Sequence, residues 1–534
     1  MRVTGTGHAG MRIDTPAGSI LCDPWVNPAF FASWFPFPDN SQLDWERLGH
    51  SDYLYISHLH RDHFDAAHLR QFVSKSATVL LPDFPTAQLE DELRVLGFTT
   101  FVRTRSNEPI ALGGGLTVMI QTLTSPSDGP LGDSSLWVEH DGIRLLNQND
   151  ARPTNLSEVR KLGPVHAHLL QFSGAIWYPM AYDLPTTTRR ELGRRKRSRQ
   201  FDRTIRYVDD LDARWVFPIA GPPCFLDDEL WSLNDLGGDE GNIFMDQQAF
   251  IDRYHERGYD NGMILLPGSV ADITSDECLL RQPVSDVRSF FAHKAEHLCA
   301  YRERQRPVIE AEKASWHHPE IDVFGQMMRR IEPLLSESTF LADRVGGPVL
   351  LELVDDDDGS VEQLLIDFTG RQLRRYADEE VRYQFRTKRS LVEHLLYTGE
   401  TDWVNSLLLS CRCSARRHGP YNEALFAFLK CLSTERLQYA EGWYAEQAPD
   451  GDDFRLDGWV VQRRCPHLKA DLSRFAVIEG DVLTCQMHGW QFDLDTGRCL
   501  TSVDHEIRAQ RTNSAPRVQP PDRALPTRQN SRSR

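Results

Sequence analysis

Short apolar runs recur through the first half of the chain and predict buried strands. The clearest run, from Asp52 to Ser57, reads Asp-Tyr-Leu-Tyr-Ile-Ser and predicts a core strand. Two earlier runs, residues 11–14 and 19–25, are separated by Pro-Ala-Gly, which is typical of a hairpin. Further strands are predicted at 78–81, 116–120, 135–139, 143–146, 165–172 and 215–223, the last running into a Pro-rich turn.

Helical spacing of apolar residues appears at 65–72 and 86–96, on either side of the strand predicted at 78–81. From about Val287 the pattern becomes helical and charged. Within this middle region, residues 348–353 and 363–367 predict strands, and 391–432 predicts two helices. We find no motif for chemistry there and expect a structural or substrate-covering role.

At 534 residues the chain is long enough for two to four domains. We predict a metal-binding domain at 1–286, an α+β middle region at 287–435 and a small all-β domain at 436–509. Residues 510–534 are polar, rich in Pro, Arg and Ser, and predict a disordered tail.

Composition and charge exclude several classes of protein. Hydrophobic residues make up 40% of the chain and charged residues 26%, which is ordinary for a globular protein. The net charge of −17 argues against a nucleic-acid binder. No apolar run reaches the ~18 residues of a membrane span, and the N-terminus lacks the apolar core of a signal peptide. Ten cysteines in this length do not form a dense disulfide framework, so we expect a cytoplasmic protein.

A dense group of metal ligands follows the strand that ends at Ser57. His58, His60, Asp62 and His63 place three imidazoles and a carboxylate within six residues. Because side chains alternate along an extended chain, His58 and His60 can point to one side. Asp62 and His63 can complete that site or bind a second metal. Imidazole and carboxylate ligands suit zinc or iron rather than calcium; a loop with chance histidines is the alternative.

The six residues from His58 to His63, called the hexad below, resemble the signature of the metallo-β-lactamase superfamily. That signature is H-x-H-x-D-H at the end of a core strand. The resemblance implies an αββα sandwich with one or two metals at its edge. It also implies that Asp150, which follows a later strand, bridges two metals; a helix N-cap is the alternative. A Gly-His loop in the superfamily supplies another histidine, but no histidine lies between His68 and His140 here.

The loop of residues 125–134 stands where that histidine would be expected. Asp128 or Asp133 can substitute as a ligand, and harder oxygen ligands favour iron or manganese over zinc. Alternatively, both aspartates are turn residues and the site binds one metal. We expect His8 to be a hydrogen-bonding loop residue rather than a metal ligand, whereas Asp23 is either a turn cap or a site residue.

A second metal motif lies near the C-terminus. Cys465-Pro466-His467 is followed, after 17 intervening residues, by Cys485-Gln486-Met487-His488. This arrangement resembles the Rieske [2Fe–2S] domain, in which two cysteines hold one iron and two histidines the other. The resemblance implies that Cys465, His467, Cys485 and His488 bind the cluster. A structural Cys2His2 zinc site is the alternative, although the C-x-H spacing is short for it.

Two charged runs complete the set of motifs. The basic run Arg189–Arg199 is either the solvated face of a helix or a clamp for a phosphate or carboxylate of the substrate. The acidic run Asp355–Asp358 predicts a solvated turn, and its spacing does not match a calcium-binding EF-hand loop.

A hydrolytic metal site needs no electrons, but a Rieske cluster supplies them. Together the two motifs favour oxygen activation at the hexad, with iron as the metal. This combination is similar to that of the CMP-N-acetylneuraminate hydroxylases and their bacterial relatives. In that family the Rieske segment precedes the hydrolase-like domain, whereas here it comes last. The segments that carry the resemblance are 18–25, 44–48, 55–63, 132–134, 146–150, 172–174 and 218–221.

The leading hypothesis is an iron-dependent Rieske monooxygenase that acts on a small molecule, for which the resemblance suggests a sugar nucleotide such as CMP-sialic acid. Electrons would pass from NAD(P)H through an external ferredoxin or reductase to the cluster, and then to a mono- or dinuclear iron centre where molecular oxygen reacts. Zinc and manganese are alternatives at this centre. Two other functions fit the same motifs: a hydrolase of lactonase or phosphodiesterase type with an accessory cluster, and a non-catalytic redox carrier or sensor.

Overall fold

The computed structural model describes residues 1–512 except 339, 446–452, 468–469, 488 and 503–504. Fourteen strands form two sheets in the first 281 residues: β1 (Arg2–Gly7), β2 (Gly10–Thr15), β3 (Gly18–Cys22), β4 (Tyr53–Tyr55), β5 (Thr78–Leu81), β6 (Phe101–Arg103), β7 (Ile110–Gly113), β8 (Leu116–Leu123), β9 (Asp133–His140), β10 (Ile143–Asn149), β11 (Ala167–Gln171), β12 (Trp215–Ile219), β13 (Val270–Ile273) and β14 (Cys278–Arg281). The orders are β14-β13-β1-β2-β3-β4-β5-β6 and β12-β11-β10-β9-β8-β7.

Strands in the middle of each sheet are buried on both faces, and alternating side chains show this directly. In β3, Ile20 faces a core shared by the two sheets, whereas Leu21 faces a separate core under the helices. In β10, Leu145 belongs to the shared core and Leu146 to the core on the outer side of the second sheet. The two sheets therefore pack face to face.

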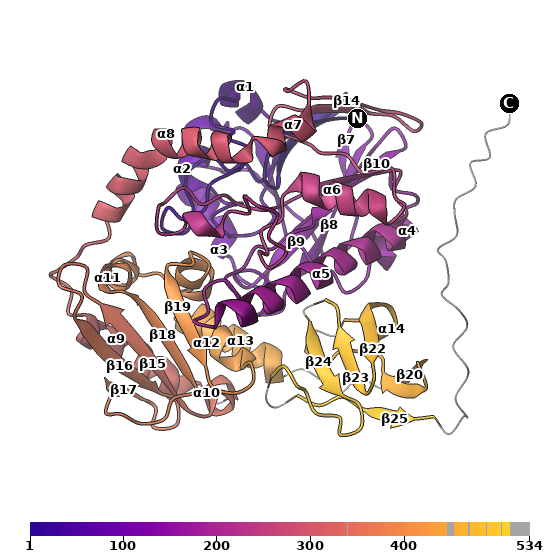
Figure 1. Cartoon of the computed structure of the whole chain (residues 1–534). Helices are drawn as coiled ribbons and strands as arrows, with labels where there is room; N and C mark the ends of the chain where they lie inside the picture. Colours follow the sequence, from indigo (N-terminus) through magenta and orange to yellow (C-terminus); the bar gives the residue numbers. More distant parts are fainter. Residues whose placement is uncertain (339, 446–452, 468–469, 488, 503–504, 513–534) are drawn as a thin grey trace.

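Helices cover the two outer faces (Figure 1). Leu69 and Leu89 share a core with Leu54 of β4, and Phe201 and Phe250 share a core with the second sheet. The order helix, sheet, sheet, helix confirms the predicted αββα sandwich. The helices of this part are α1 (Trp45–Gly49), α2 (Ala66–Phe72), α3 (Gln88–Val95), α4 (Ser157–Lys161), α5 (Thr186–Leu211), α6 (Gln247–Glu256), α7 (Val287–Ala292) and a 3₁₀ turn at Trp231–Leu233.

The first strand, β1, was not predicted from the sequence. Its sequence, RVTGTG, contains Val3 as its single large apolar residue, so the period-two signal of a buried strand is weak. Its position matters because β1 ends next to His8, and thereby brings this histidine to the same sheet edge as the hexad.

The middle region forms a second unit around a five-stranded sheet of order β17-β16-β15-β18-β19. Its strands are β15 (Pro348–Val354), β16 (Val361–Asp367), β17 (Gln372–Arg375), β18 (Tyr383–Lys388) and β19 (Cys413–Arg417). Its helices are α9 (Val323–Glu337), α10 (Phe340–Val345), α11 (Arg389–Thr398), a π-helix at Val404–Leu408, α12 (Glu423–Lys430) and α13 (Thr434–Ala445). The preceding helix, α8 (Lys294–Ala314), instead packs on the core of the first unit through Leu298 and Tyr301. The helices predicted within 391–432 are α11 and α12, but β19 and the π-helix lie between them.

The C-terminal unit contains two three-stranded sheets, β20-β21-β25 and β22-β23-β24. Its elements are β20 (Asp453–Leu456), β21 (Trp459–Gln462), α14 (Leu472–Phe475), β22 (Ala476–Glu479), β23 (Val482–Cys485), β24 (Trp490–Asp493) and β25 (Ala509–Arg511). The unit packs on α5 through a shared core (Figure 1). The predicted tail begins inside β25, because Ala509–Arg511 pairs with β21; residues 513–534 lie outside the described residues.

Candidate metal centre and Rieske site

The hexad occupies the turn that follows β4, where the chain leaves the sheet edge. The amides of His63 and Phe64 both donate to the carbonyl of His60, at 2.9 and 2.7 Å. This tight turn brings the imidazoles together: Nε2 of His58 lies 2.6 Å from Nδ1 of His60. Two ring nitrogens at that distance need a shared proton or a cation between them.

Neighbouring strands turn sharply at the same edge. His8 follows β1, Asp23 follows β3, and Asn149 is the last residue of β10. Their φ angles are all positive, at 53°, 41° and 41° respectively. Non-glycine residues adopt this left-handed conformation uncommonly, and they do so disproportionately at functional sites. The turns place His8, Asp23 and Asp150 beside the hexad.

The potential ligands fall into two groups. His58, His60 and Asp150 form one group, in which the ligand atoms lie within 4.8 Å of one another. The second group, by the same measure, is His8, Asp62 and His63. Oδ2 of Asp150 lies 3.9 Å from Nε2 of His58 and 3.7 Å from Nε2 of His63. Asp150 therefore stands between the groups, where a bridging carboxylate would be.

Buried polar atoms in these groups show that the residues fit metal ions. Within the described part of the chain, several of their atoms are buried without a hydrogen-bond partner, including His60 Nε2, Asp62 Oδ1, His63 Nε2 and Asp150 Oδ1. Such atoms are rare in folded proteins and call for an explanation. Imidazole nitrogens and carboxylate oxygens that converge in this way are the donors that zinc and iron prefer.

A second layer of residues orients the imidazoles. Asp23 accepts hydrogen bonds from the amide and hydroxyl of Ser57, each at 2.7 Å, and lies 3.0 Å from Nδ1 of His63. Oδ1 of Asp133 lies 3.2 Å from Nδ1 of His58. In both histidines the Nδ1 edge is occupied by a carboxylate, so Nε2 faces the other ligands. Carboxylates in this position fix ring orientation and raise ligand basicity.

Charge coupling at the site is strong. Burial lowers the pKa of His63, but the carboxylates of Asp150, Asp62 and Asp23 outweigh it and raise that pKa to about 10. Burial and the neighbouring His58 lower the pKa of His60 to about 3. Rings so close together thus differ widely in proton affinity, and metal binding to them would be coupled to proton release.

The loop of residues 125–134 is held by the middle unit. Nζ of Lys430 lies 2.8 Å from the carbonyl of Gly129, and the side-chain amide of Asn405, in the π-helix, donates to the same carbonyl at 3.1 Å. Burial and the Asp133 carboxylate raise the pKa of Asp128 to about 7. Among the described residues, neither Asp128 nor Asp133 belongs to the two ligand groups. Asp133 lies beside His58, and a ligand role for Asp128 or Asp133 stays a prediction.

The second motif lies in the C-terminal unit. Cys465 follows β21, Cys485 ends β23, and both thiols are buried in one core. The imidazole of His467 stacks on Trp490, with ring centroids 4.1 Å apart and an angle of 11° between the planes. Nε2 of His467 lies 3.2 Å from Oε2 of Glu423, which belongs to α12 of the middle unit. His488, the fourth predicted ligand, lies outside the described residues.

Helix α5 joins the C-terminal unit to the first. Arg203 donates to the carbonyl of Met487 at 2.9 Å. The hydroxyl of Tyr207 donates to the carbonyl of Pro153 at 2.8 Å and lies 3.3 Å from the sulfur of Met487. Met487 follows Cys485 by two residues, and Pro153 follows Asp150 by three. The two metal motifs are thus linked through one tyrosine side chain.

The basic run of the sequence lies on the first half of α5. Arg190, Arg194 and Arg197 pair with Asp239, Glu191 and Asp235. Arg190 and Arg194 are exposed, whereas Arg197 is largely buried with Asp235, so the run is not a uniformly solvated face, and both interpretations stay predictions.

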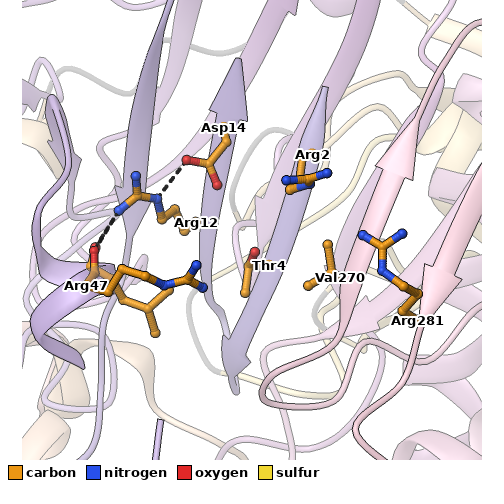
Figure 2. Close-up of a pocket in the computed structure, with 8 residues that line it drawn as sticks. Arg2, Thr4, Arg12, Asp14, Arg47, Val270 and Arg281 are labelled. Carbon is orange, nitrogen blue, oxygen red and sulfur yellow. Dashed lines mark hydrogen bonds and ion pairs between the residues drawn. The ribbon is translucent and has the colours of Figure 1, made fainter. Parts of the chain in front are cut away.

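A cavity of about 410 Å³ lies away from both motifs, on the eight-stranded sheet (Figure 2). It is rich in arginine, but Arg12 is paired with Asp14 at 2.8 Å, and Arg2 and Arg281 are both paired with Asp272 at 2.7 Å. Its charges are therefore largely compensated within the protein.

Comparison with known proteins places the chain in a family. It is 49% identical over 519 residues to a Rieske 2Fe-2S iron-sulfur protein of Mycolicibacterium smegmatis, covering 96% of this chain and 100% of that one. A protein of the same description from Mycobacterium tuberculosis is 49% identical over 521 residues, again covering 96% and 100%. The chain belongs to this family of Rieske iron–sulfur proteins. Residues 452–509 match the Rieske [2Fe-2S] domain, and residues 323–446 match the Rv3818-like, SCP2-like domain.

More distant similarities cover about half of the chain or less. The cytidine monophosphate-N-acetylneuraminic acid hydroxylase of Xenopus laevis is 26% identical over 239 residues, which are 41% of this chain and 38% of that enzyme. The predicted resemblance to these hydroxylases is thus confirmed. Among solved structures, CmlA, a diiron β-hydroxylase from Streptomyces venezuelae, is 20% identical with a TM-score of 0.32 and covers 50% of this chain and 53% of its own. A metallo hydrolase from Ignicoccus hospitalis is 17% identical with a TM-score of 0.33, covering 53% and 98%.

Three residues of these sites were undervalued or missed by sequence reasoning. His8 was expected to be a loop residue, but its Nε2 lies 2.9 Å from Oδ2 of Asp62 and it belongs to a ligand group. Asp23 was an open choice, and the structure places it behind His63. Glu423 had no sequence signal at all, because its contact with His467 arises from packing between units.

Proposed function

We propose that this protein is an iron-dependent Rieske monooxygenase that hydroxylates a small organic molecule. The observation that carries the proposal is the pair of ligand groups at the sheet edge, in a chain that also contains a Rieske [2Fe–2S] domain. A hydrolase would use the ligand groups but would have no need of the cluster.

The residues would divide the work between two centres. One metal would be held by His58, His60 and Asp150, a second by His8, Asp62 and His63, and the cluster by Cys465, His467, Cys485 and His488. A Rieske cluster bound by two cysteines and two histidines is fully ligated and supplies single electrons. Catalytic metal sites keep positions open, so oxygen and substrate would meet at the hexad.

The protein's own side chains would prepare this site. Asp23 and Asp133 hold the rings of His63 and His58 by their Nδ1 edges. The middle unit fixes the loop beside His58 through Lys430 and Asn405, and would shield the reacting centre from bulk water.

A sugar nucleotide such as CMP-sialic acid is the substrate class that the similarity to the CMP-N-acetylneuraminic acid hydroxylases supports. Molecular oxygen would be the co-substrate, and an external ferredoxin or reductase that uses NAD(P)H would supply electrons. We expect the protein to work in the cytoplasm. Among the helices that the structure describes, none combines the length and apolar character needed to cross a bilayer.

Metal analysis with oxygen-dependent turnover tests the proposal. We would quantify iron, zinc, manganese and acid-labile sulfide per chain, reduce the protein anaerobically, and add oxygen with CMP-sialic acid and related sugar nucleotides. The proposal predicts more iron than the two atoms of one cluster, and a hydroxylated product only when oxygen is present. Stoichiometric zinc with turnover that needs no oxygen would establish a hydrolase instead. A cluster accompanied by an empty hexad would indicate a redox carrier.

A further inference from the structure

Glu423 is a carboxylate of the middle unit buried against the Rieske unit. It lies in the first turn of α12, and its side chain is only 6% exposed. Its Oε2 lies 3.2 Å from Nε2 of His467 and 3.9 Å from Nε2 of His505. Its Oε1 accepts a hydrogen bond from the hydroxyl of Tyr444, on α13. Three side chains therefore converge on one buried carboxylate.

The contact decides which nitrogen of His467 can face the cluster. Because Nε2 is the ring nitrogen that lies beside Glu423, Nδ1 lies on the other side of the ring and is the nitrogen that the iron would take. The ring is also fixed on its face, where it stacks on Trp490 at 4.1 Å. A carboxylate on the outer nitrogen of a metal-bound imidazole fixes the ring and raises its basicity.

Helix α12 extends this contact toward the first unit. Glu423 stands at its start and Lys430 at its end, where Nζ bonds the carbonyls of Ser127 and Gly129 at 3.1 and 2.8 Å. A Cβ on Gly129 would lie 3.5 Å from Cδ2 of His58. A helix of eight residues is about 12 Å long, so one short helix contacts the surroundings of both metal motifs.

We propose that Glu423 is a positioning residue for the Rieske cluster: it fixes the ring of His467 and lowers the reduction potential of the cluster. The inference rests on the proposed function, since it takes His467 as a cluster ligand. Reduction adds one electron to the cluster, and a buried anion beside a ligand opposes that added charge. The SCP2-like unit thereby becomes part of the redox machinery rather than a cover alone.

Substitution at Glu423 and Tyr444 separates charge from packing. Glu423→Gln keeps the size of the side chain but removes the negative charge. Tyr444→Phe keeps the charge and removes a donor that disperses it. Glu435→Gln, at an exposed position of α13, is the matched control. Each protein is titrated electrochemically at pH 8.5, and the reduced cluster is followed by its electron paramagnetic resonance signal and visible spectrum.

We expect a more positive potential in Glu423→Gln, a more negative one in Tyr444→Phe, and no change in Glu435→Gln. Equal potentials in all proteins with intact clusters would overturn the inference and leave the proposed function standing. If Glu423→Gln fails to assemble the cluster, the sign of the Tyr444→Phe shift decides. If the unaltered protein has no Rieske signal, the proposed function itself is wrong.

Discussion

Asp23 holds His63 from behind: its carboxylate lies 3.0 Å from Nδ1 of the imidazole, and both side chains are fully buried. The same carboxylate accepts two hydrogen bonds from Ser57, the residue before the hexad. The end of β3 therefore determines the orientation of a ligand that follows β4.

Replacing Asp23 should weaken metal binding without removing a ligand. In Asp23→Asn the negative charge is lost and only one accepting oxygen remains, so the side chain can no longer serve both Ser57 and the imidazole of His63 as the carboxylate does. We expect a loss of roughly 10–100-fold in metal affinity at the hexad, the range seen when such supporting carboxylates are changed. Competition between the protein and a chelator for Co²⁺ measures it. Asp141→Asn, at an exposed turn, is the control, and an affinity unchanged in Asp23→Asn would show that the contact does not support the ligand.

His60→Ala should abolish product formation while leaving the cluster chemically reducible. The reason is that His60 belongs to a ligand group in the first unit, whereas the cluster motif lies in another. We would reduce the variant anaerobically, add oxygen and candidate substrates, and follow the cluster spectrum and the product separately. His50→Ala removes an exposed histidine and should behave as the unaltered protein. Hydroxylation by His60→Ala at a near-normal rate would remove the hexad from the mechanism.

The strands of the sandwich could be predicted where apolar residues are large and consecutive. β5 was placed at 78–81, and the structure has Thr78–Leu81. β1 could not be predicted in this way, because Thr and Gly occupy most of its positions and burial between neighbours compensates for its weak signal.

The residues of the site also fall into two classes: those that a local sequence pattern reveals, and those that only the fold brings together. The hexad is local in sequence, so its chemistry is visible before any fold is known. His8 and Asp23 reach it only because β1, β2, β3 and β4 are neighbours in one sheet. The contact of Glu423 with His467 depends on how the middle and C-terminal units pack against each other, which no local pattern encodes.

Cys465→Ser should remove the Rieske absorption and leave metal at the hexad. The cysteine lies in the unit built from β20 to β25, whose sheets share no strand with the sandwich, so the sandwich should fold without the cluster. Visible spectroscopy, circular dichroism and metal content per chain report the two centres separately. Cys499→Ser alters a half-buried cysteine of the same unit outside the motif and should keep the cluster. Loss of metal from the hexad in Cys465→Ser would show that the two centres assemble together.

Tyr207→Phe should slow electron transfer from the cluster to the hexad, while the cluster and the metal at the hexad both remain bound. The hydroxyl of Tyr207 joins Met487, beside the cluster motif, to the carbonyl of Pro153, three residues after Asp150. Its removal leaves a buried carbonyl unsatisfied, at a cost of about 1–3 kcal/mol in the free energy of unfolding, and loosens the contact between the units.

Stopped-flow mixing measures this effect directly. We would reduce the cluster anaerobically, mix with oxygen and substrate, and record the rate at which its visible band returns. Tyr259→Phe is the control, because that hydroxyl bonds Asp209 at the surface. We expect a several-fold slower return in Tyr207→Phe and no change in Tyr259→Phe, with equal metal contents in both. If the two variants reoxidise at the same rate, electrons reach the hexad by a route that does not involve Tyr207. The contact to alter next is then the one that runs from Glu423 through α12 to the loop at Gly129.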